Sequence, residues 1–127
     1  MDLLLDTHAF IWFVEGSSEL SLVSKNEILD QENVKYVSIV SLWEMSIKVA
    51  QGKLDLKSPF ETVLDDIFNN GFRLLDLKFE HILQNTNLDW HHRDPFDRLL
   101  ISQAIVDNLK VLTKDKHFPS YPISIIW

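Results

Sequence analysis

Short apolar or β-branched runs alternate along the chain with segments of helical periodicity. The runs that predict strands are 3–5, 34–38, 72–77 and 110–113, and a closing edge strand is expected at 123–126. Unbroken apolar runs are typical of strands that are buried on both faces, as in a parallel sheet. Strands that alternate with helices make right-handed crossovers, so their carboxyl ends lie along one edge of the sheet. The pattern therefore predicts an α/β fold with a central, mainly parallel sheet of four to five strands.

Helical segments are expected between these strands. They are 9–14, 20–31, 41–50, 59–69, 79–85 and 95–108, with a brief extended piece at 54–56. The second of these helices should turn Leu20, Val23 and Ile28 towards the core, because these apolar residues recur among polar neighbours. The chain has 127 residues and neither an internal repeat nor a low-complexity run, so a single domain, 1–127, is expected.

Composition excludes several kinds of protein. There is no cysteine, which rules out disulfides and thiolate metal sites. The apolar run at the start is too short for a signal peptide or a membrane span, so a soluble, cytoplasmic protein is expected. The net charge of −7 argues against a general basic surface for nucleic acid. It does not exclude a nucleic-acid enzyme, because cations bound among acids reduce the local negative charge.

The segment 94–104, DPFDRLLISQA, places an acid on the apolar face of a helix. Asp94 suits the N-cap and Pro95 suits the first helical position. At about 100° per residue, Asp97 then falls near the middle of the apolar arc. Asp97 could serve only as a capping partner of Asp94. A carboxylate aimed inward is costly unless something compensates it, which favours a second explanation, that Asp97 helps to hold a cation at the rim of the core.

Three further acids lie at or near the ends of strands. Asp6 directly follows the first strand, Glu44 comes shortly after the second, and Asp115 lies just past the fourth. With Asp97 they would meet at one edge of the sheet, where four carboxylates repel one another unless protons or metal ions neutralise them. Oxygen ligands alone favour Mg²⁺, with Mn²⁺ as the alternative ion. One or two such ions can activate water and stabilise the attacking and leaving oxygens of a phosphodiester.

Each of these acids also has a local explanation. Asp6 could be the N-cap of the next helix, and Asp115 could be a turn residue. Glu44 fits a capping box with Ser41 and an i,i+4 pair with Lys48. The sequence is compatible both with these local explanations and with a metal site.

Two other features suggest chemistry less strongly. Asp76 lies late in its strand and is either a further ligand or, more simply, a solvated strand-end acid. His91 and His92 invite a zinc site, but adjacent histidines point apart and no cysteine or H-E-x-x-H spacing completes one. Contact with substrate phosphates, or a place on the surface, is expected for the two histidines instead.

Four segments, LLLDTHAF, SLWEMSIK, DPFDRLLISQA and LTKDKHF, occur in an order and spacing that resemble the PIN domain. They are most similar to its VapC branch, the toxin ribonucleases of bacterial type II toxin–antitoxin pairs. The resemblance covers essentially the whole chain. It implies a three-layer α/β/α fold, a Mg²⁺-dependent endoribonuclease, a homodimer, and an antitoxin that blocks the site.

Matched residue by residue, the resemblance assigns the site to particular positions. The acidic quartet falls on Asp6, Glu44, Asp97 and Asp115, with Thr7, Asp94 and Thr113 as accessory residues and Lys48 and Arg98 as candidate phosphate contacts. In this hypothesis Asp6 and Asp97 bind the principal ion, and the other two acids hold a second ion or its waters. Asp94 either binds metal or only caps its helix. His8 stands where other members often have a small polar residue, so its part in placing substrate is open.

Two other functions share features with this sequence. A haloacid-dehalogenase-type phosphatase needs a second Asp two residues after the first, where this chain has His8. A catalytically inactive PIN-like binding module is the other alternative. It predicts an incomplete acidic quartet, whereas all four positions here are acidic.

Overall fold

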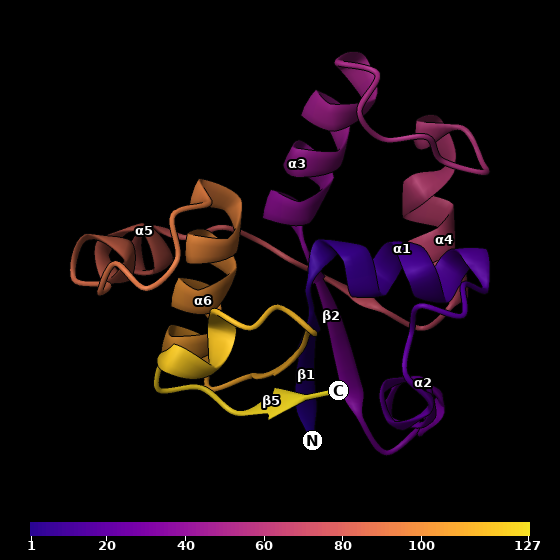
Figure 1. Ribbon diagram of the computed structural model, residues 1–127. Coiled ribbons are helices and arrows are strands. Elements are labelled where there is room, and N and C mark those ends of the chain that lie inside the picture. The colour runs from indigo at the N-terminus through magenta and orange to yellow at the C-terminus, as the bar shows by residue number, and fades with distance from the viewer.

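A five-stranded sheet, parallel throughout, forms the centre of this computed structural model, which describes all 127 residues (Figure 1). The strands are β1 (Asp2–Leu5), β2 (Val34–Ser38), β3 (Arg73–Leu75), β4 (Lys110–Leu112) and β5 (Ile125–Ile126), in the order β3-β2-β1-β4-β5. The helices are α1 (Thr7–Glu15), α2 (Leu22–Leu29), α3 (Ile39–Ala50), α4 (Val63–Asn69), α5 (Phe79–Thr86) and α6 (Pro95–Asp107). The α/β class and the parallel sheet are confirmed.

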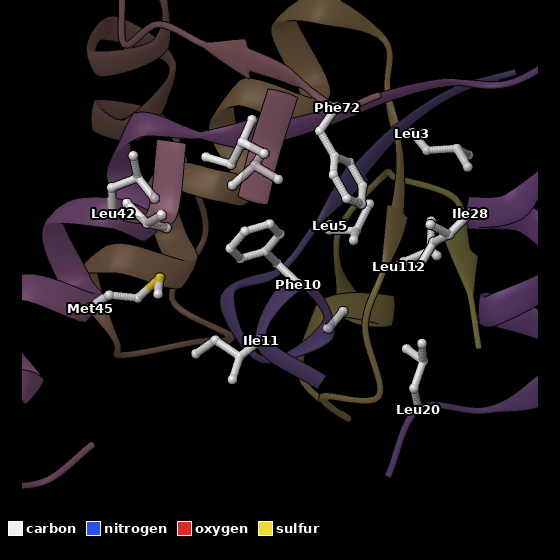
Figure 2. Close-up of a cluster of buried hydrophobic side chains, with 14 residues drawn as sticks. Leu3, Leu5, Phe10, Ile11, Leu20, Ile28, Leu42, Met45, Phe72 and Leu112 are labelled. Carbon is white, nitrogen blue, oxygen red and sulfur yellow. The ribbon is translucent and has the colours of Figure 1, made fainter. Parts of the chain in front are cut away.

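The central strand β1 is buried on both faces. Leu3, Leu4 and Leu5 have no exposed surface. Because side chains alternate along a strand, Leu3 and Leu5 join one apolar cluster, with Phe10 of α1 (Figure 2), while Leu4 joins a second cluster with Leu100 of α6. Helices therefore cover both faces of the sheet, and the expected three layers are present.

The helices divide between the two faces in a way that places the site. Helices α1, α2 and α4 contribute to the first apolar cluster and α6 to the second. Helix α3 contributes to both clusters and packs against α1 and α6 (Figure 1). The beginnings of α1 and α6 and the side of α3 thus converge beyond the carboxyl ends of β1 and β4.

Helix α2 is shorter than predicted. It begins after Ser21, whose hydroxyl accepts a hydrogen bond from the Ser24 N–H at 3.1 Å. Leu20 and Ile28 are buried as expected, but the prediction that Val23 faces the core is wrong, because the shorter helix leaves it 55% exposed.

Other boundaries shift by a few residues. The extended piece expected at 54–56 is not a strand, and the helix expected at 59–69 is a 3₁₀ turn, Phe60–Thr62, followed by α4. The strand expected at 72–77 pairs only over β3. None of the helices has the length and apolar stretch needed to cross a membrane.

The predicted start of α3 is wrong. The helix begins at Ile39 rather than Ser41, and its N-cap is Ser38. The Ser38 hydroxyl accepts from the Val40 N–H at 3.0 Å and donates to Gln103 Oε1 at 2.6 Å. No capping box forms, because the earlier start carries Glu44 into the second turn of the helix, on its buried side.

Candidate active site

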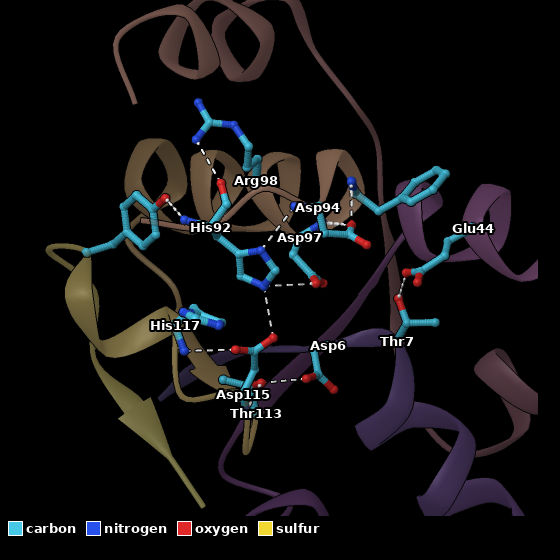
Figure 3. Close-up of polar contacts among 12 residues, drawn as sticks. Asp6, Thr7, Glu44, His92, Asp94, Asp97, Arg98, Thr113, Asp115 and His117 are labelled. Carbon is cyan, nitrogen blue, oxygen red and sulfur yellow. Dashed lines mark hydrogen bonds and ion pairs between the residues drawn. The ribbon is translucent and has the colours of Figure 1, made fainter. Parts of the chain in front are cut away.

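The acids predicted from separate segments line one cavity of about 520 Å³ at the carboxyl edge of the sheet (Figure 3). Asp6 follows β1, Glu44 lies on α3, Asp97 is in the first turn of α6, and Asp115 follows β4. Asp94, the N-cap of α6, lines the same cavity. The structure therefore brings together all four acids of the quartet, although each comes from a different part of the chain.

Asp6 both caps a helix and faces the cavity. Its Oδ1 accepts from the Ala9 N–H at 2.7 Å, and its Oδ2 accepts from the Thr113 hydroxyl at 2.5 Å. Burial raises the pKa of Asp6 above its usual value, although these two hydrogen bonds act in the opposite direction. The capping explanation is thus confirmed for Asp6, which also lines the cavity, and its part in a metal site stays a prediction.

Glu44 is 3% exposed and is held by two neighbours. The Thr7 hydroxyl donates to its Oε1 at 2.7 Å and also lies 2.9 Å from the Ser41 hydroxyl. The ammonium of Lys48 donates to the other carboxylate oxygen, Oε2, at 2.5 Å. Thr7 and Lys48 therefore supply the partners that a buried carboxylate requires.

Lys48 lines the cavity as the expected i,i+4 partner of Glu44. Burial alone would lower the pKa of Lys48, but its hydrogen bond to Glu44 and the charges of Glu44, Asp94 and Asp97 raise it above the usual value. The side chain thus carries its positive charge among the acids. A contact with substrate phosphate stays a prediction for this residue.

Asp97 has the most altered chemistry of the group. Burial, followed by the charges of Asp94, Glu44, Asp6 and Asp115, raises its pKa to about 8. The Asp97 carboxyl therefore keeps its proton at neutral pH when only the side chains of the cavity surround it. An acid that cannot ionise beside its neighbours is in the situation that a bound cation relieves.

Asp115 is shifted in the other direction. Burial would raise its pKa, but hydrogen bonds from the His117 N–H (2.8 Å) and from His92, with the charges of both rings, lower it below the usual value. Thr113 joins Asp115 to Asp6, because its hydroxyl accepts from the Asp115 N–H at 3.0 Å while donating to the Asp6 carboxylate. Thr7 and Thr113 thus each hold an acid of the quartet in place.

His92 also belongs to this cluster, which the sequence did not predict. Its Nε2 lies 2.9 Å from Asp115 Oδ2 and 3.2 Å from Asp97 Oδ2. Its Nδ1 accepts from the Asp94 N–H at 3.1 Å, so the ring hydrogen of the neutral imidazole sits on Nε2. His92 is 8% exposed; its Nε2 hydrogen-bonds Asp115 and lies in close contact with Asp97. The surface position expected for it is therefore wrong, because its ring is buried between the Asp94 N–H and the carboxyl groups of Asp97 and Asp115. A contact with substrate phosphate stays a prediction.

The backbone around His92 is held equally firmly. Its N–H donates to the Tyr121 hydroxyl at 2.8 Å, and its carbonyl accepts from Arg98 Nη1 at 3.2 Å. One signal was present in the sequence: a residue two positions before the N-cap Asp94 must lie at the same sheet edge as the helix start. The placement of this backbone was not predictable, because it is held by Tyr121, 29 residues away.

The expected phosphate-steering role of Arg98 does not fit the structure. Arg98 is 4% exposed, and its guanidinium donates to the backbone carbonyls of Leu88, Asp89 and His92 at 2.9–3.2 Å. It does not line the acidic cavity. Arg98 instead braces the loop that carries His92.

Asp94 caps α6 through Oδ1, which accepts from the N–H groups of Phe96 (2.9 Å) and Asp97 (3.0 Å).

Three other residues considered in the sequence are exposed. His8 lies at the cavity wall, with its ring centre 5.5 Å from that of Trp12. Asp76 is an exposed strand-end acid that lies outside this cavity. His91 is exposed and packs edge-on against Tyr121.

The donor set fits a hard divalent cation. The cavity offers five carboxylates and two threonine neighbours, and the chain has no thiolate. One nitrogen or oxygen each from His92, Asp97 and Asp115 lie within 4.8 Å of one another. Oxygen ligands in this number suit Mg²⁺ or Mn²⁺ better than Zn²⁺.

Comparison with known proteins agrees with this geometry. A profile of the PIN domain matches residues 3–123. A chain of VapBC2 from Rickettsia felis, solved bound to a promoter DNA fragment, is 21% identical, with a TM-score of 0.70 over 99% of this chain and 98% of that one. A chain of DNA-bound VapBC from Salmonella typhimurium is 16% identical, with a TM-score of 0.72 over 99% and 97%. The PIN domain endonuclease Utp24 is 15% identical, with a TM-score of 0.53 over 93% and 74%.

No curated protein sequence matches the chain. At these identities the solved structures show a shared fold alone, and the family rests on the profile. That profile extends across the sheet from β1 to β4 and includes every acid that lines the cavity. The chain therefore belongs to the PIN domain family.

Proposed function

We propose that this protein is a Mg²⁺- or Mn²⁺-dependent endoribonuclease and the toxin of a type II toxin–antitoxin pair. The observation that carries the proposal is the convergence of Asp6, Glu44, Asp97 and Asp115 on one cavity, with the pKa of Asp97 raised to about 8. PIN domains are generally nucleases, and the complete set of acids supports an active member.

Asp6 and Asp97 would hold the principal ion, and Glu44 and Asp115 a second ion or its waters. When bound, such an ion activates water and stabilises the charge that develops on a phosphodiester. His92 keeps Asp97 and Asp115 oriented through its Nε2–H, which is a supporting role known to matter at metal sites in general.

The cations at the cavity wall would guide the substrate. Lys114 and Lys116 are exposed and line the cavity beside the acids. Lys114 also lies 2.8 Å from Glu19, an exposed pair that costs little to separate. Lys48, already engaged with Glu44, adds positive charge to the same cavity.

Cleavage of RNA by the purified protein tests the proposal. The wild type should cleave single-stranded RNA in Mg²⁺ or Mn²⁺ and stop in EDTA. Asp6→Asn and Asp97→Asn should abolish cleavage while circular dichroism shows an intact fold. Asp76→Asn is the matched control, because Asp76 is a strand-end acid outside the cavity, and it should cleave like the wild type. Full activity in either site variant defeats the proposal.

A protein antitoxin and a homodimer belong to the same proposal. The similar chains from Rickettsia felis and Salmonella typhimurium come from VapBC assemblies, and another from Klebsiella pneumoniae comes from a toxin–antitoxin complex. We expect a cytoplasmic protein whose RNA cleavage stops when its antitoxin is added. Light scattering of the isolated protein should give the mass of a dimer.

The inactive binding module is the competing function. It requires no metal, so it predicts that Mg²⁺ leaves the melting temperature unchanged. The phosphatase alternative is disfavoured because the position of its second acid is His8, which is exposed at the cavity wall.

A further inference from the structure

Trp90 is an unusually exposed aromatic residue beside the acidic cavity. It is 76% exposed, on the turn that precedes α6. The guanidinium carbon of Arg98 lies 3.7 Å from the centre of its ring, so one side of the indole rests on a planar cation. Because Arg98 is buried and bonded to three carbonyls, that support is rigid. The indole is therefore held in one orientation while most of it faces solvent.

Trp90 lines a second cavity, of about 450 Å³. The other residues around it are polar or charged: His91, His92, Arg93, Asp94 and His117. Asp94 and His117 also line the acidic cavity, so the two cavities adjoin. His92 connects them directly, because its ring contacts Asp97 and Asp115.

We propose that the cavity at Trp90 binds a nucleobase of single-stranded RNA, next to the nucleotide whose phosphodiester enters the acidic cavity. This inference rests on the proposed nuclease function and adds a substrate subsite to it. Bases of single strands stack on exposed aromatic rings, and such stacking is largely independent of sequence. The exposed Arg93 supplies a positive charge beside the ring for the connecting phosphate.

A simpler role for Trp90 is to cover Arg98. Any apolar side chain of similar reach could shield the guanidinium, whereas only an aromatic ring can stack on a base. Trp90→Leu and Trp90→Phe separate the two roles, since both keep an apolar cover and only Phe keeps a ring.

Binding is measured in the Asp97→Asn background with Mg²⁺, so that RNA is not cut. A fluorescein-labelled single-stranded RNA is titrated by anisotropy, and inorganic polyphosphate competes as a probe of charge alone. Trp90→Leu should weaken RNA binding about tenfold, in line with the stacking of one base, and Trp90→Phe should weaken it less than threefold. Neither change should alter binding of polyphosphate. Phe68→Leu removes a 58% exposed aromatic ring on α4 and should have no effect.

Equal RNA affinity of the Leu and Phe variants overturns the inference, and so does an equal loss of polyphosphate binding. Thermal melting of each variant identifies a folding defect; in that case 5-iodouridine RNA is photo-crosslinked to the unsubstituted indole and the peptide is mapped. Crosslinking at Trp90 supports the subsite, and crosslinking only elsewhere rejects it. Cleavage by the wild type decides the nuclease proposal separately.

Discussion

His92 shows how a single ring can organise a cluster of acids. Its Nδ1 accepts from the Asp94 N–H, which leaves Nε2–H to bond Asp115 while lying 3.2 Å from Asp97. An N–H in this place gives the neighbouring buried carboxyl groups a polar partner, so they can lie close together. The role depends on the position of this one N–H.

Replacing His92 tests that role. The amide nitrogen of Gln can approach the place of Nε2, whereas Leu offers no donor. We expect His92→Leu to lower Mg²⁺-dependent RNA cleavage about 10- to 100-fold, the usual cost of losing a group that orients metal ligands, and His92→Gln to lose less. Initial cleavage rates over a range of Mg²⁺ concentrations provide the measurement. Equal activity of the two variants would show that the donor is unimportant.

Asp97 should make the protein less stable as pH rises. Its pKa is about 8 in the folded state against an ordinary value of 3.8, so between these pH values the folded state holds a proton that the unfolded state has released. The free energy of unfolding therefore falls from pH 4 to 8 because of this group. Asp97→Asn removes the effect and should stabilise the protein by up to about 5 kcal/mol at pH 8, with little gain at pH 4.

Urea denaturation in EDTA at the two pH values measures this difference. Asp115 is the matched contrast. Because its pKa is lowered, its stabilising contribution is present at neutral pH and is lost as pH falls through the folded-state pKa, so Asp115→Asn should destabilise the protein at pH 8. A gain for Asp97→Asn that is the same at both pH values would contradict the raised pKa.

Among the elements, α3 and α6 differ in how far sequence could define them. The predicted start of α6 is confirmed, because the N-cap Asp94 and Pro95 at the first helical position are a local signal that no distant contact changes. The start of α3 was wrong, because Ser38 and Ser41 are both plausible caps. Ser38 is the N-cap in the structure, where its hydroxyl donates to the side chain of Gln103, 65 residues away in the sequence. Local chemistry predicted where chain segments end, and long-range contacts decided between equal local options.

The N-cap of α3 should contribute measurably to stability. Ser38 is fully buried, accepts from the Val40 N–H and donates to Gln103. Ser38→Ala loses the cap and leaves the Gln103 carbonyl without its partner, so it should lower the free energy of unfolding by about 2 kcal/mol. Ser46→Ala serves as the control, since the Ser46 hydroxyl bonds only the Trp43 carbonyl on the exposed side of α3, and should change it by less than about 0.5 kcal/mol. Similar losses in both variants would argue against Ser38 as the cap.

For the whole molecule, the fold was predictable and the finer arrangement of the site was not. Apolar runs and their alternation with helices defined the sheet, and strand ends located Asp6 and Asp115. The resemblance to PIN domains identified the acidic quartet as a set. The use of Arg98 as a brace could not be predicted, because it follows from carbonyls in the loop before α6. A charged residue near acids looks the same in sequence whether it faces substrate or backbone.

The protonated Asp97 should couple metal binding to pH. An incoming divalent ion must displace the Asp97 proton. Mg²⁺ affinity should therefore rise with pH, by up to about tenfold per unit below pH 8, and level off above it. Titration calorimetry in buffers of different ionisation enthalpy counts the released protons. Affinity that does not change with pH in the wild type would refute the coupling, and Asp97→Asn should show much weaker dependence.

The central position of β1 has a consequence for the lifetime of the site. β1 pairs with β2 on one side and with β4 on the other, and Asp6 is the next residue after it. The Asp6 backbone is tied to the sheet as well, because its N–H donates to the Leu112 carbonyl at 3.1 Å, so carrying this backbone away from the site requires β1 to separate from β4. The backbone amides of Leu4 and Leu5 should exchange with deuterated solvent only through that separation. Their exchange rate would then report how often the acidic cluster comes apart.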